Sequence, residues 1–547
     1  MASLLAKVGR VLGRKLQEGL RAELVVGERA APIDGGRGVS PADGWSADAW
    51  DGAEPIGEAT MWQRGEFLWR ICPESGDTLP NQPASELSGE GWAEARSAHR
   101  QEIAVVLARC WRESGREDFA NGAIEALESW LAYDRSEVGV GWIHSSDLAV
   151  RVMRWGLISG WLREEIDPGL ERLIAGAVLN HARSLEARLS LLSGDEDHRL
   201  VVQASGLVVA GLMWPNLPGA GGWWSRGLSL LGRYLDGVVL PDGSPVGGDP
   251  GAHLMAIEAA LVARAFAVAN GVGFPAGADS AIIRGAWFLR VLEGDGDEAG
   301  LLETRGVATV LPPWGCSKGR SLHAAVVAAG LATVDDDMAE GEIDRNATLL
   351  AGVRACCAAP LDRGDGWGLH AFRDGGWALA QADDGRFALA TRLALRGAPL
   401  QPIWSARGVE VLASPASISG VGLSKGELLS ARAEPRRVVV RSEGGGSGGR
   451  IARECRLRGA RLEILDRHEG GGDLMVVWHI AAGWSDWEQD GATFKAKSGD
   501  VKLTVKLSEE LEWRRDEQES ASGTISRLLG RGAVEPGSRI ASRFELR

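Results

Sequence analysis

The sequence lacks the marks of several large protein classes. Its 6 Cys residues are scattered without CxxC spacing, which indicates buried free thiols rather than a disulfide framework or a zinc site. No run reaches the roughly 20 apolar residues that a membrane helix needs. A P-loop, a GxSxG elbow and an HExxH motif are also missing. We therefore expect no membrane span, no metal ion and no cofactor.

Basic residues are too dispersed for a nucleic-acid-binding protein. The net charge is −14 and no basic tract is longer than a few residues, whereas phosphate binding needs a positive face. A local cluster such as Arg151, Arg154 and Arg199 can still bind a polyanion against the global charge. We expect no nucleic acid as a partner, and we keep a polyanionic substrate open.

The N-terminal residues 1–26 lack the continuous apolar stretch of a signal peptide. Basic residues such as Lys7, Arg10 and Arg14 interrupt the apolar pattern, which predicts an amphipathic helix instead. We expect a cytoplasmic protein. A periplasmic protein, exported by a leader that this chain does not carry, is the alternative.

Helical periodicity dominates the first half of the chain, whose 547 residues are too many for one ordinary core. After a lead-in segment, 1–91, successive apolar stripes are separated by short or Gly- and Pro-rich connections. This pattern predicts helical hairpins that form a bundle or an array curling on itself. The expected helices are 92–112, 118–132, 144–163, 168–191, 198–213, 223–238, 251–270, 279–293 and 319–332.

The period changes from helical to two after about residue 345. "RLEILDRHEGGGDLMVVWHI" (461–480) contains two strand-like runs around a Gly-rich turn, and "VKLTVKL" (501–507) alternates apolar with polar residues. "RSEGGGSGGR" (441–450) is flanked by strand patterns and predicts a hairpin tip. We predict a helical domain over 92–345 and an antiparallel β-sandwich over 346–547.

Polar residues gather at the starts of three expected helices. In "GVGWIHSSDLAVRVMRW" (139–155), a serine can cap the helix, and Trp142 and His144 lie at its N-terminal rim. Asp147 and Arg151 are spaced as an i, i+4 pair. The pattern favours a capped core helix over a binding role.

The second stretch is "DEDHRLVVQASGLVVAGLMWP" (195–215). His198, Arg199 and Gln203 stand within six positions at one end of an otherwise apolar helix, in which Gly206 and Gly211 allow close packing. An acidic run, including Glu196, precedes them and complements the helix dipole. Function and simple capping explain this stretch equally well.

The third stretch is the loop "LPDGSPVGGDPGAHL" (240–254). Asp249 and Pro250 suit the N-cap and N1 positions, which places Ala252 and His253 in the first helical turn. A histidine there tends to be neutral and can serve as a base or a donor. The loop is either a plain turn or the rim of a site built on helix ends.

Together, these stretches resemble the heparinase II/III-like polysaccharide lyase family over roughly residues 130–400. "GVGWIHSSDLAVRVMRW", "HRLVVQASGLVVAGLMWP" and "LPDGSPVGGDPGAH" are similar, in order and spacing, to the family's Trp–Ser–acidic segment, its Asn-His helix and its Tyr-His loop. "LPPWGCSKGRSL" (311–322) and "RLEILDRHEG" are weaker similarities. The resemblance implies an (α/α) toroid of helical hairpins followed by the β-sandwich.

The resemblance also implies cleavage of uronate-containing polysaccharides by β-elimination. The family's carboxylate-neutralising Asn falls on His198 and its following His on Arg199, while His253 keeps the loop histidine and is expected to act as base or acid. Trp142, His144, Gln203, Asp249 and Tyr234 are the expected substrate-binding residues. An acidic polysaccharide is the expected partner.

Two departures from the family pattern leave other functions open. The family's catalytic Tyr falls on Ala252, which cannot transfer a proton, and its His-rich stretch has no match in 377–399. A glycan-binding or polysaccharide-assembly protein without catalysis is one alternative. An inverting glycoside hydrolase using carboxylates such as Asp147, Glu196, Asp242 and Asp249 is another.

Overall fold

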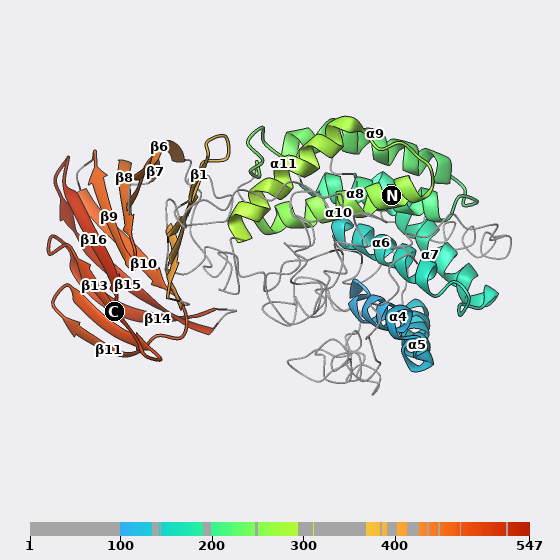
Figure 1. Ribbon diagram of the computed structural model, residues 1–547, viewed down its shortest axis with the longest axis horizontal. Helices are drawn as coiled ribbons and strands as arrows, with labels where there is room; N and C mark the ends of the chain where they lie inside the picture. The colour runs from blue at the N-terminus through green and yellow to red at the C-terminus, as the bar shows by residue number, and fades with distance from the viewer. Residues whose placement is uncertain are drawn as a thin grey trace, which may run out of the picture.

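The helical half consists of hairpins in which inner and outer helices alternate. In the computed structural model, its helices are α4 (Glu102–Ser114), α5 (Glu117–Tyr133), α6 (Ser145–Trp161), α7 (Pro168–Ala187), α8 (His198–Met213), α9 (Ala220–Val238), α10 (Pro250–Ala269) and α11 (Ala276–Glu293). Figure 1 shows them on one side of the molecule, with the strands on the other. The structure describes residues 99–133, 142, 144–189, 198–246, 250–293, 310, 368–382, 385–390, 402–407, 409–412, 426–434, 437–446, 449–470, 472–520 and 523–547.

The inner helices α6 and α8 run parallel to each other. Gln203, in the second turn of α8, bonds Ser145 at the start of α6, and Gly206 contacts Ala149 one turn further along both helices. Contacts between α8 and α10 likewise begin at their first turns, where His198 faces His253. The N-termini of α6, α8 and α10 therefore lie at the same end of the helical domain.

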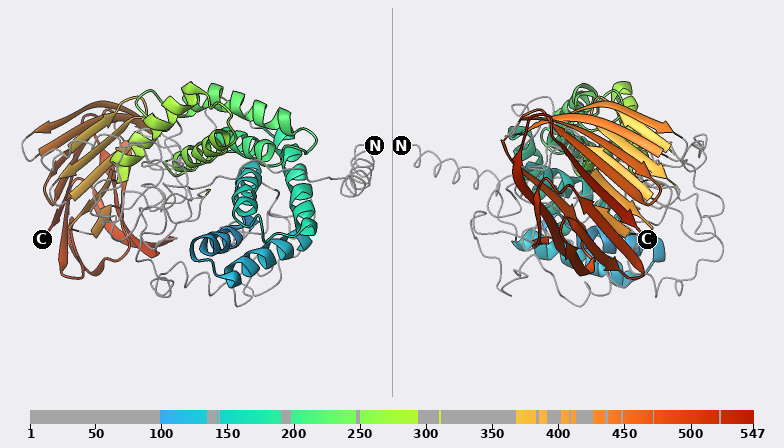
Figure 2. Two further views of the ribbon diagram at one scale, coloured as in Figure 1. Left: turned by 45° about the vertical axis from the view of Figure 1, so that its right-hand side comes forward. Right: turned by 90° about the vertical axis from the view of Figure 1, so that its left-hand side faces the viewer.

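The outer helix α9 runs antiparallel to α8, and glycines let the two backbones approach closely. Gly227 lies against Ala204 and Val208 near the middle of α8, and Gly211, close to the end of α8, lies against Ala220 at the start of α9. The packing role predicted for Gly206 and Gly211 is confirmed. In Figure 2 the helix pairs follow an arc, which is the (α/α) toroid.

The strands form two antiparallel eight-stranded sheets. The first has the order β1-β2-β3-β4-β5-β10-β15-β14 and the second β11-β12-β13-β16-β9-β8-β7-β6. Their bounds are β1 Gly368–Phe372, β2 Trp377–Ala382, β3 Gly385–Ala390, β4 Pro402–Ala406, β5 Val409–Leu412, β6 Gly426–Glu434, β7 Arg437–Gly446, β8 Gly449–Arg458, β9 Arg461–His468, β10 Gly472–Ile480, β11 Ser485–Asp490, β12 Thr493–Ser498, β13 Val501–Leu507, β14 Glu512–Ser520, β15 Gly523–Val534 and β16 Arg539–Leu546.

Alternation along the strands separates the two sides of the first sheet. Ala378 and Ala380 of β2 lie in the core between the sheets, whereas Trp377 and Leu379 belong to the core of the helical domain. The first sheet therefore turns its outer side toward the helices. The outer side of the second sheet faces away from them (Figure 1).

The predicted fold class is confirmed, with one difference within 461–480. "RSEGGGSGGR" forms the expected hairpin, β7 with β8. The two strands of "RLEILDRHEGGGDLMVVWHI", however, do not pair with each other: β9 pairs with β8 and β16, and β10 with β15 and β5. The chain crosses between sheets at their Gly-rich turn. The lead-in segment 1–91, the helix expected at 319–332 and the boundary at 345 lie outside the described residues.

One described helix, α10, is long and apolar enough to cross a membrane by length and composition. Of its most apolar window, 72% is buried inside the protein. Its side chains pack against other helices: Phe266 lies against Gly156 of α6 and Ile257 against Gly285 of α11, each at 0% exposure. This burial is typical of the core helix of a toroid.

The contact between α6 and α8 gives a test of the fold. A methyl group added to Gly206 would lie 2.8 Å from the Cβ of Ala149 and 2.9 Å from its Cα, whereas one added to Gly221 on α9 meets nothing within 4 Å. We expect Gly206→Ala to lower the free energy of unfolding by about 1–3 kcal/mol through overpacking. Gly221→Ala, the control, should raise it by about 0.5–1 kcal/mol through helix propensity. Denaturant unfolding measures both, and equal effects would contradict the parallel packing.

Candidate functional site at the N-terminal ends of the inner helices

The N-terminal ends of α6, α8 and α10 form the best candidate for a site. Each helix N-terminus carries backbone N–H groups without an intrahelical partner and a partial positive charge. Because three such ends lie together, this end of the toroid favours anions. His144, His198 and His253 all stand within the first turn of one of these helices or directly before it.

His198 and Arg199 occupy the middle of this end, at the start of α8. His198 is 8% exposed, and Arg199 is exposed. The ring of His198 lies 6.0 Å from that of His253 on α10, at 85°. Of the three residues expected to carry the chemistry, these two histidines come together, while Arg199 points outward beside them.

His253 is fully buried, which changes the role expected for it. Its Nε2 lies 3.3 Å from the carbonyl oxygen of Gly285 on α11, and its ring lies 5.7 Å from that of Phe288. Burial and, to a lesser degree, the neighbouring His198 lower the pKa of His253 to about 3. The imidazole is therefore neutral at physiological pH and is shielded from solvent by protein. This burial disagrees with the expected role of base or acid, because a substrate cannot reach the ring.

Gln203 links α8 to α6 behind this surface. It is 0% exposed and donates its Nε2–H to Ser145 Oγ, so its amide is occupied within the protein. His144, the N-cap residue of α6, is half-buried and stands next to this link. His144 therefore lies at the N-terminal end of α6, where the sequence predicts it, whereas Gln203 holds the two helices in register.

Trp142 packs around a buried histidine and presents no open face. It is 4% exposed, and its ring lies 4.3 Å from that of His181 on α7, which also contacts Trp155 at 4.8 Å. Arg188, at the end of α7, donates to the carbonyl oxygen of Trp142 at 2.8 Å. A sugar ring would have to displace these contacts, so we correct the stacking role expected for Trp142 to packing.

The charges of α6 serve the core and do not form an anion-binding cluster. Arg151 is 0% exposed and donates to His181 Nε2 at 2.6 Å and to the carbonyl oxygen of His99 at 2.7 Å. Asp147 accepts hydrogen bonds from Arg100 at 2.7 and 2.9 Å. The i, i+4 pairing expected between Asp147 and Arg151 is therefore wrong, because each finds a partner from another segment.

The remaining expected residues, Tyr234 and Asp249, and the departure at Ala252 add less to this end. Tyr234 is half-buried on α9, with the Arg233 guanidinium 5.4 Å from its ring, and makes no described contact with His198 or His253. Ala252 is half-buried in the first turn of α10, where the family's tyrosine would stand. Asp249 lies outside the described residues.

The loop that precedes α10 is where the sandwich docks. Asp242 accepts hydrogen bonds from the backbone N–H of Ser244 at 3.1 Å and of Asp374, in the β1–β2 turn, at 2.7 Å. Gly243 has φ +90°, and a Cβ there would meet the carbonyl oxygen of Arg284 at 2.2 Å. The Gly-rich sequence thus allows a tight turn between α11 and the sandwich. Sequence patterns did not reveal this contact, because Asp242 and Asp374 are far apart in the chain.

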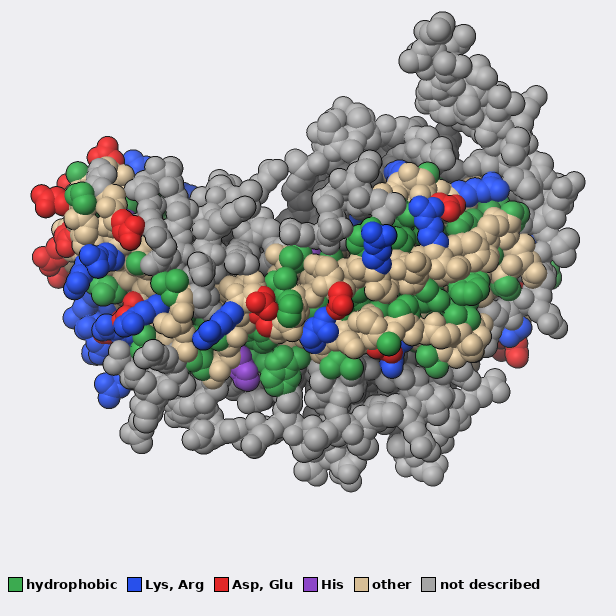
Figure 3. All heavy atoms as spheres, turned by 90° about the horizontal axis from the view of Figure 1, so that it is seen from above, with side chains coloured by type: hydrophobic (Ala, Val, Ile, Leu, Met, Phe, Trp, Pro, Cys, Tyr) green, Lys and Arg blue, Asp and Glu red, His purple; other side chains and the backbone are tan. Residues whose placement is uncertain are grey.

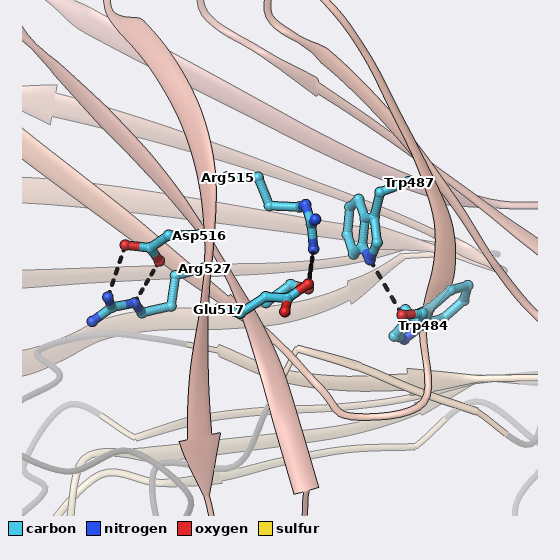
Figure 4. A network of polar contacts seen from close by, with 7 residues as sticks. Trp484, Trp487, Arg515, Asp516, Glu517 and Arg527 are labelled. Carbon is cyan, nitrogen blue, oxygen red and sulfur yellow. Dashed lines mark hydrogen bonds and ion pairs between the residues drawn. The ribbon is translucent and has the colours of Figure 1, made fainter.

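The first sheet also brings a histidine to its helix-facing side. His479 on β10 alternates with Trp478 and Ile480, which lie in the core between the sheets. It is 5% exposed, and burial together with Arg527 lowers its pKa to about 4. Arg527 in turn pairs with Asp516 through two hydrogen bonds of 2.7 and 2.8 Å (Figure 4). Sequence analysis missed this residue because strand partners cannot be read from one chain segment.

Metal binding has no support among the residues that the structure describes. Within them, no group of three or more His, Cys, Asp and Glu side chains is placed to hold an ion.

Comparisons with known proteins agree with the resemblance seen in the sequence. Residues 170–283, from α7 to α11, match the family described as Heparinase II/III N-terminus. The fold is similar to that of a crystal structure of heparinase III, with 11% identity, 97% of this chain and 88% of that chain covered, and a TM-score of 0.65. No curated protein matches by sequence.

Two further solved structures share the fold. One is the chondroitin AC lyase of Streptomyces coelicolor A3 in complex with chondroitin sulphate, at 11% identity, with 97% and 82% coverage and a TM-score of 0.53. The other is the heparan sulfate lyase HepC from Pedobacter heparinus, at 12% identity, with 89% and 83% coverage and a TM-score of 0.50. These likenesses establish the fold, a lyase-type (α/α) toroid with a β-sandwich.

The buried histidine gives a test by pH. His253 has a pKa of about 3 when folded and 6.5 as a reference, so the unfolded chain binds more protons between these values. The contribution of neutral His253 to the free energy of unfolding is fully present above about pH 6.5 and is lost as the pH drops toward 3. We expect His253→Gln to reduce the slope of unfolding free energy against pH, between pH 6 and pH 4, by up to about 1.4 kcal/mol per unit. Denaturant unfolding at each pH measures it.

The exposed His370 on β1 provides the matched control. We expect His370→Gln to change the slope less, because its side chain is exposed and burial lowers the pKa of His370 less than that of His253. An unchanged slope in His253→Gln would mean that His253 titrates normally in the folded protein.

Proposed function

We propose that this chain, heparinase II/III-like in residues 170–283 and in its fold, cleaves an acidic, uronate-containing polysaccharide by β-elimination. The observation that supports the proposal is the position of His198 and Arg199 in the first turn of α8, between the N-terminal ends of α6 and α10. An imidazole, a guanidinium and three positive helix ends there favour a carboxylate.

The reaction makes a specific demand on such a site. The C5 proton of a uronate is removed, the C4–O bond breaks, a C4–C5 double bond forms, and the departing oxygen takes up a proton. The C5 proton becomes acidic enough only when the carboxylate charge is neutralised. In the proposal, His198 donates a hydrogen bond to the carboxylate and Arg199 supplies the positive charge.

Proton removal needs an imidazole that substrate can reach. His253 is excluded by its burial, and Ala252 has no group that transfers protons. His144 is half-buried at the N-cap of α6, next to the Ser145–Gln203 link that joins α6 to α8. We assign the base to His144, with His253 holding His198 in place from behind.

A glycan-binding protein without catalysis is the second candidate. The specific observation in its favour is that the family's tyrosine position holds Ala252, next to a histidine that burial keeps neutral. The inverting hydrolase has less support. Asp147 is paired with Arg100, Asp242 holds the sandwich, and Glu196 and Asp249 lie outside the described residues.

The activity is tested by incubating the folded protein with a panel of uronic-acid polysaccharides and following the ultraviolet absorbance of the unsaturated product. We expect His198→Ala and His144→Ala each to lower kcat/KM at least 100-fold, in the range seen when a transition-state donor or a base is removed. Arg199→Ala should chiefly raise KM. Arg183→Ala changes an exposed position on α7 and is the control. It should leave kcat/KM and KM unchanged.

The products and the binding data separate the three candidates. Saturated reducing ends would assign hydrolysis. No turnover of any chain, together with calorimetric binding that His198→Ala abolishes, would assign a binding protein and contradict the lyase proposal.

A further inference from the structure

The outer side of the second sheet concentrates positive charge in a chain whose net charge is −14. We define the basic face as the outward positions of β8, β9, β12, β13 and β16, which alternate with core residues along each strand. Figure 3 shows Lys and Arg side chains gathered at the sandwich end of the molecule, with Asp and Glu side chains beside them. The face points away from the helices and from the candidate site.

Many of its cations have no carboxylate partner within 4 Å among the described residues. They come from all five strands and are exposed or half-buried. Outward positions on neighbouring strands are about 5 Å apart, and successive ones along a strand about 7 Å, so the charges form a continuous field. These cations are Arg458, Arg467, Lys495, Lys502, Lys506 and Arg539.

The carboxylates on the face are too few to neutralise the rest. Glu463 is shared by Arg461 at 2.5 Å and Arg543 at 2.7 Å, which leaves one positive charge over. Glu454, at the border with β7, is shared in the same way by Arg441 at 2.6 Å and Arg456 at 2.5 Å.

The first sheet neutralises some of its arginines and not others. On β14 and β15, Arg515 pairs with Glu517 and Arg527 pairs with Asp516 (Figure 4), whereas Arg514 and Arg531 have no carboxylate partner within 4 Å among the described residues. The basic face differs in the number of such cations on adjoining strands.

We propose that the basic face is a second binding surface, separate from the helix ends, for a linear anionic polysaccharide. The charge of the basic face is the argument for a polyanion. The choice of a polysaccharide rests on the proposed function. The side chains agree with it. Outward positions of the five strands carry no aromatic ring to stack on bases and no large exposed apolar side chain to enter a membrane.

The test removes three unpaired cations at once. The variant Lys502→Gln, Lys506→Gln, Arg539→Gln changes exposed positions only. We expect its affinity for chondroitin sulfate, measured calorimetrically at low salt, to fall at least about tenfold, and the slope of log affinity against log salt to decrease by about 2, since fewer counterions are released. The control Arg163→Gln, Arg172→Gln, Arg183→Gln, exposed on and before α7, makes the same change in net charge and should stay within about twofold.

Competition and activity identify the ligand. Duplex DNA and vesicles with anionic lipid are titrated at the same salt. Tighter binding of either one, lost in the basic-face variant, would overturn the choice of a polysaccharide, and unchanged binding of chondroitin sulfate in that variant would overturn the second surface itself. Cleavage of a uronate tetrasaccharide, if the lyase proposal holds, should be the same in variant and parent. Absence of cleavage contradicts the lyase proposal alone, because the binding measurement does not depend on turnover.

Discussion

The structure depends on the constraint that the inner helices are buried on all sides. Along α6 and α8 nearly every residue is inaccessible to solvent, as in a helix packed against neighbours all round. Such a helix can carry polar groups in only two places: where another segment satisfies them, or at its N-terminal end, where backbone N–H groups are unsatisfied. Within the toroid, polar groups that a ligand can reach are therefore confined to the helix ends, and the candidate site lies there for the same reason that the middle of α8 is apolar.

The buried charges of α6 and α10 are examples of polar groups that another segment of the chain satisfies. Arg154 is 1% exposed and donates to the carbonyl oxygen of Val310 at 2.7 Å, while Glu258 of α10 accepts the N–H of the same residue at 2.5 Å. Both backbone groups of Val310 are thus satisfied by side chains from two inner helices. Burying two charges is expensive unless each is hydrogen-bonded, so removing one partner alone would leave the other charge uncompensated. These two hydrogen bonds hold Val310 against α6 and α10.

How much the sequence predicts follows from the range of the interactions. The helices from α5 to α11 begin and end within four residues of the expected positions, because capping, glycine and apolar period act locally. The partner of Asp147 was not predictable, because Arg100 precedes it by 47 residues and an equally spaced Arg151 stood nearby. The roles expected for Trp142 and His253 disagree with the structure for a related reason. A sequence shows that an indole or an imidazole is present, but its burial is decided by side chains from distant helices, such as His181 and Phe288. The roles of β9 and β10 in different sheets likewise depend on pairing across the whole sandwich.

The distribution of charge makes the proposed acidic ligand compatible with an acidic chain. Net charge governs long-range repulsion, but within about one Debye length, roughly 10 Å, a ligand experiences local groups. Positive groups lie at the N-terminal ends of the inner helices and on the outer side of the second sheet, with the thickness of the sandwich between them. A short oligosaccharide can occupy only one of these surfaces at a time. A long chain that passes around the sandwich would turn its second contact into an intramolecular one, so its avidity would rise with length even if neither surface bound more tightly. With the two proposed surfaces on opposite sides of the sandwich, the proposals together imply that a polymer binds more tightly than a fragment, independently of the sugar in the repeat.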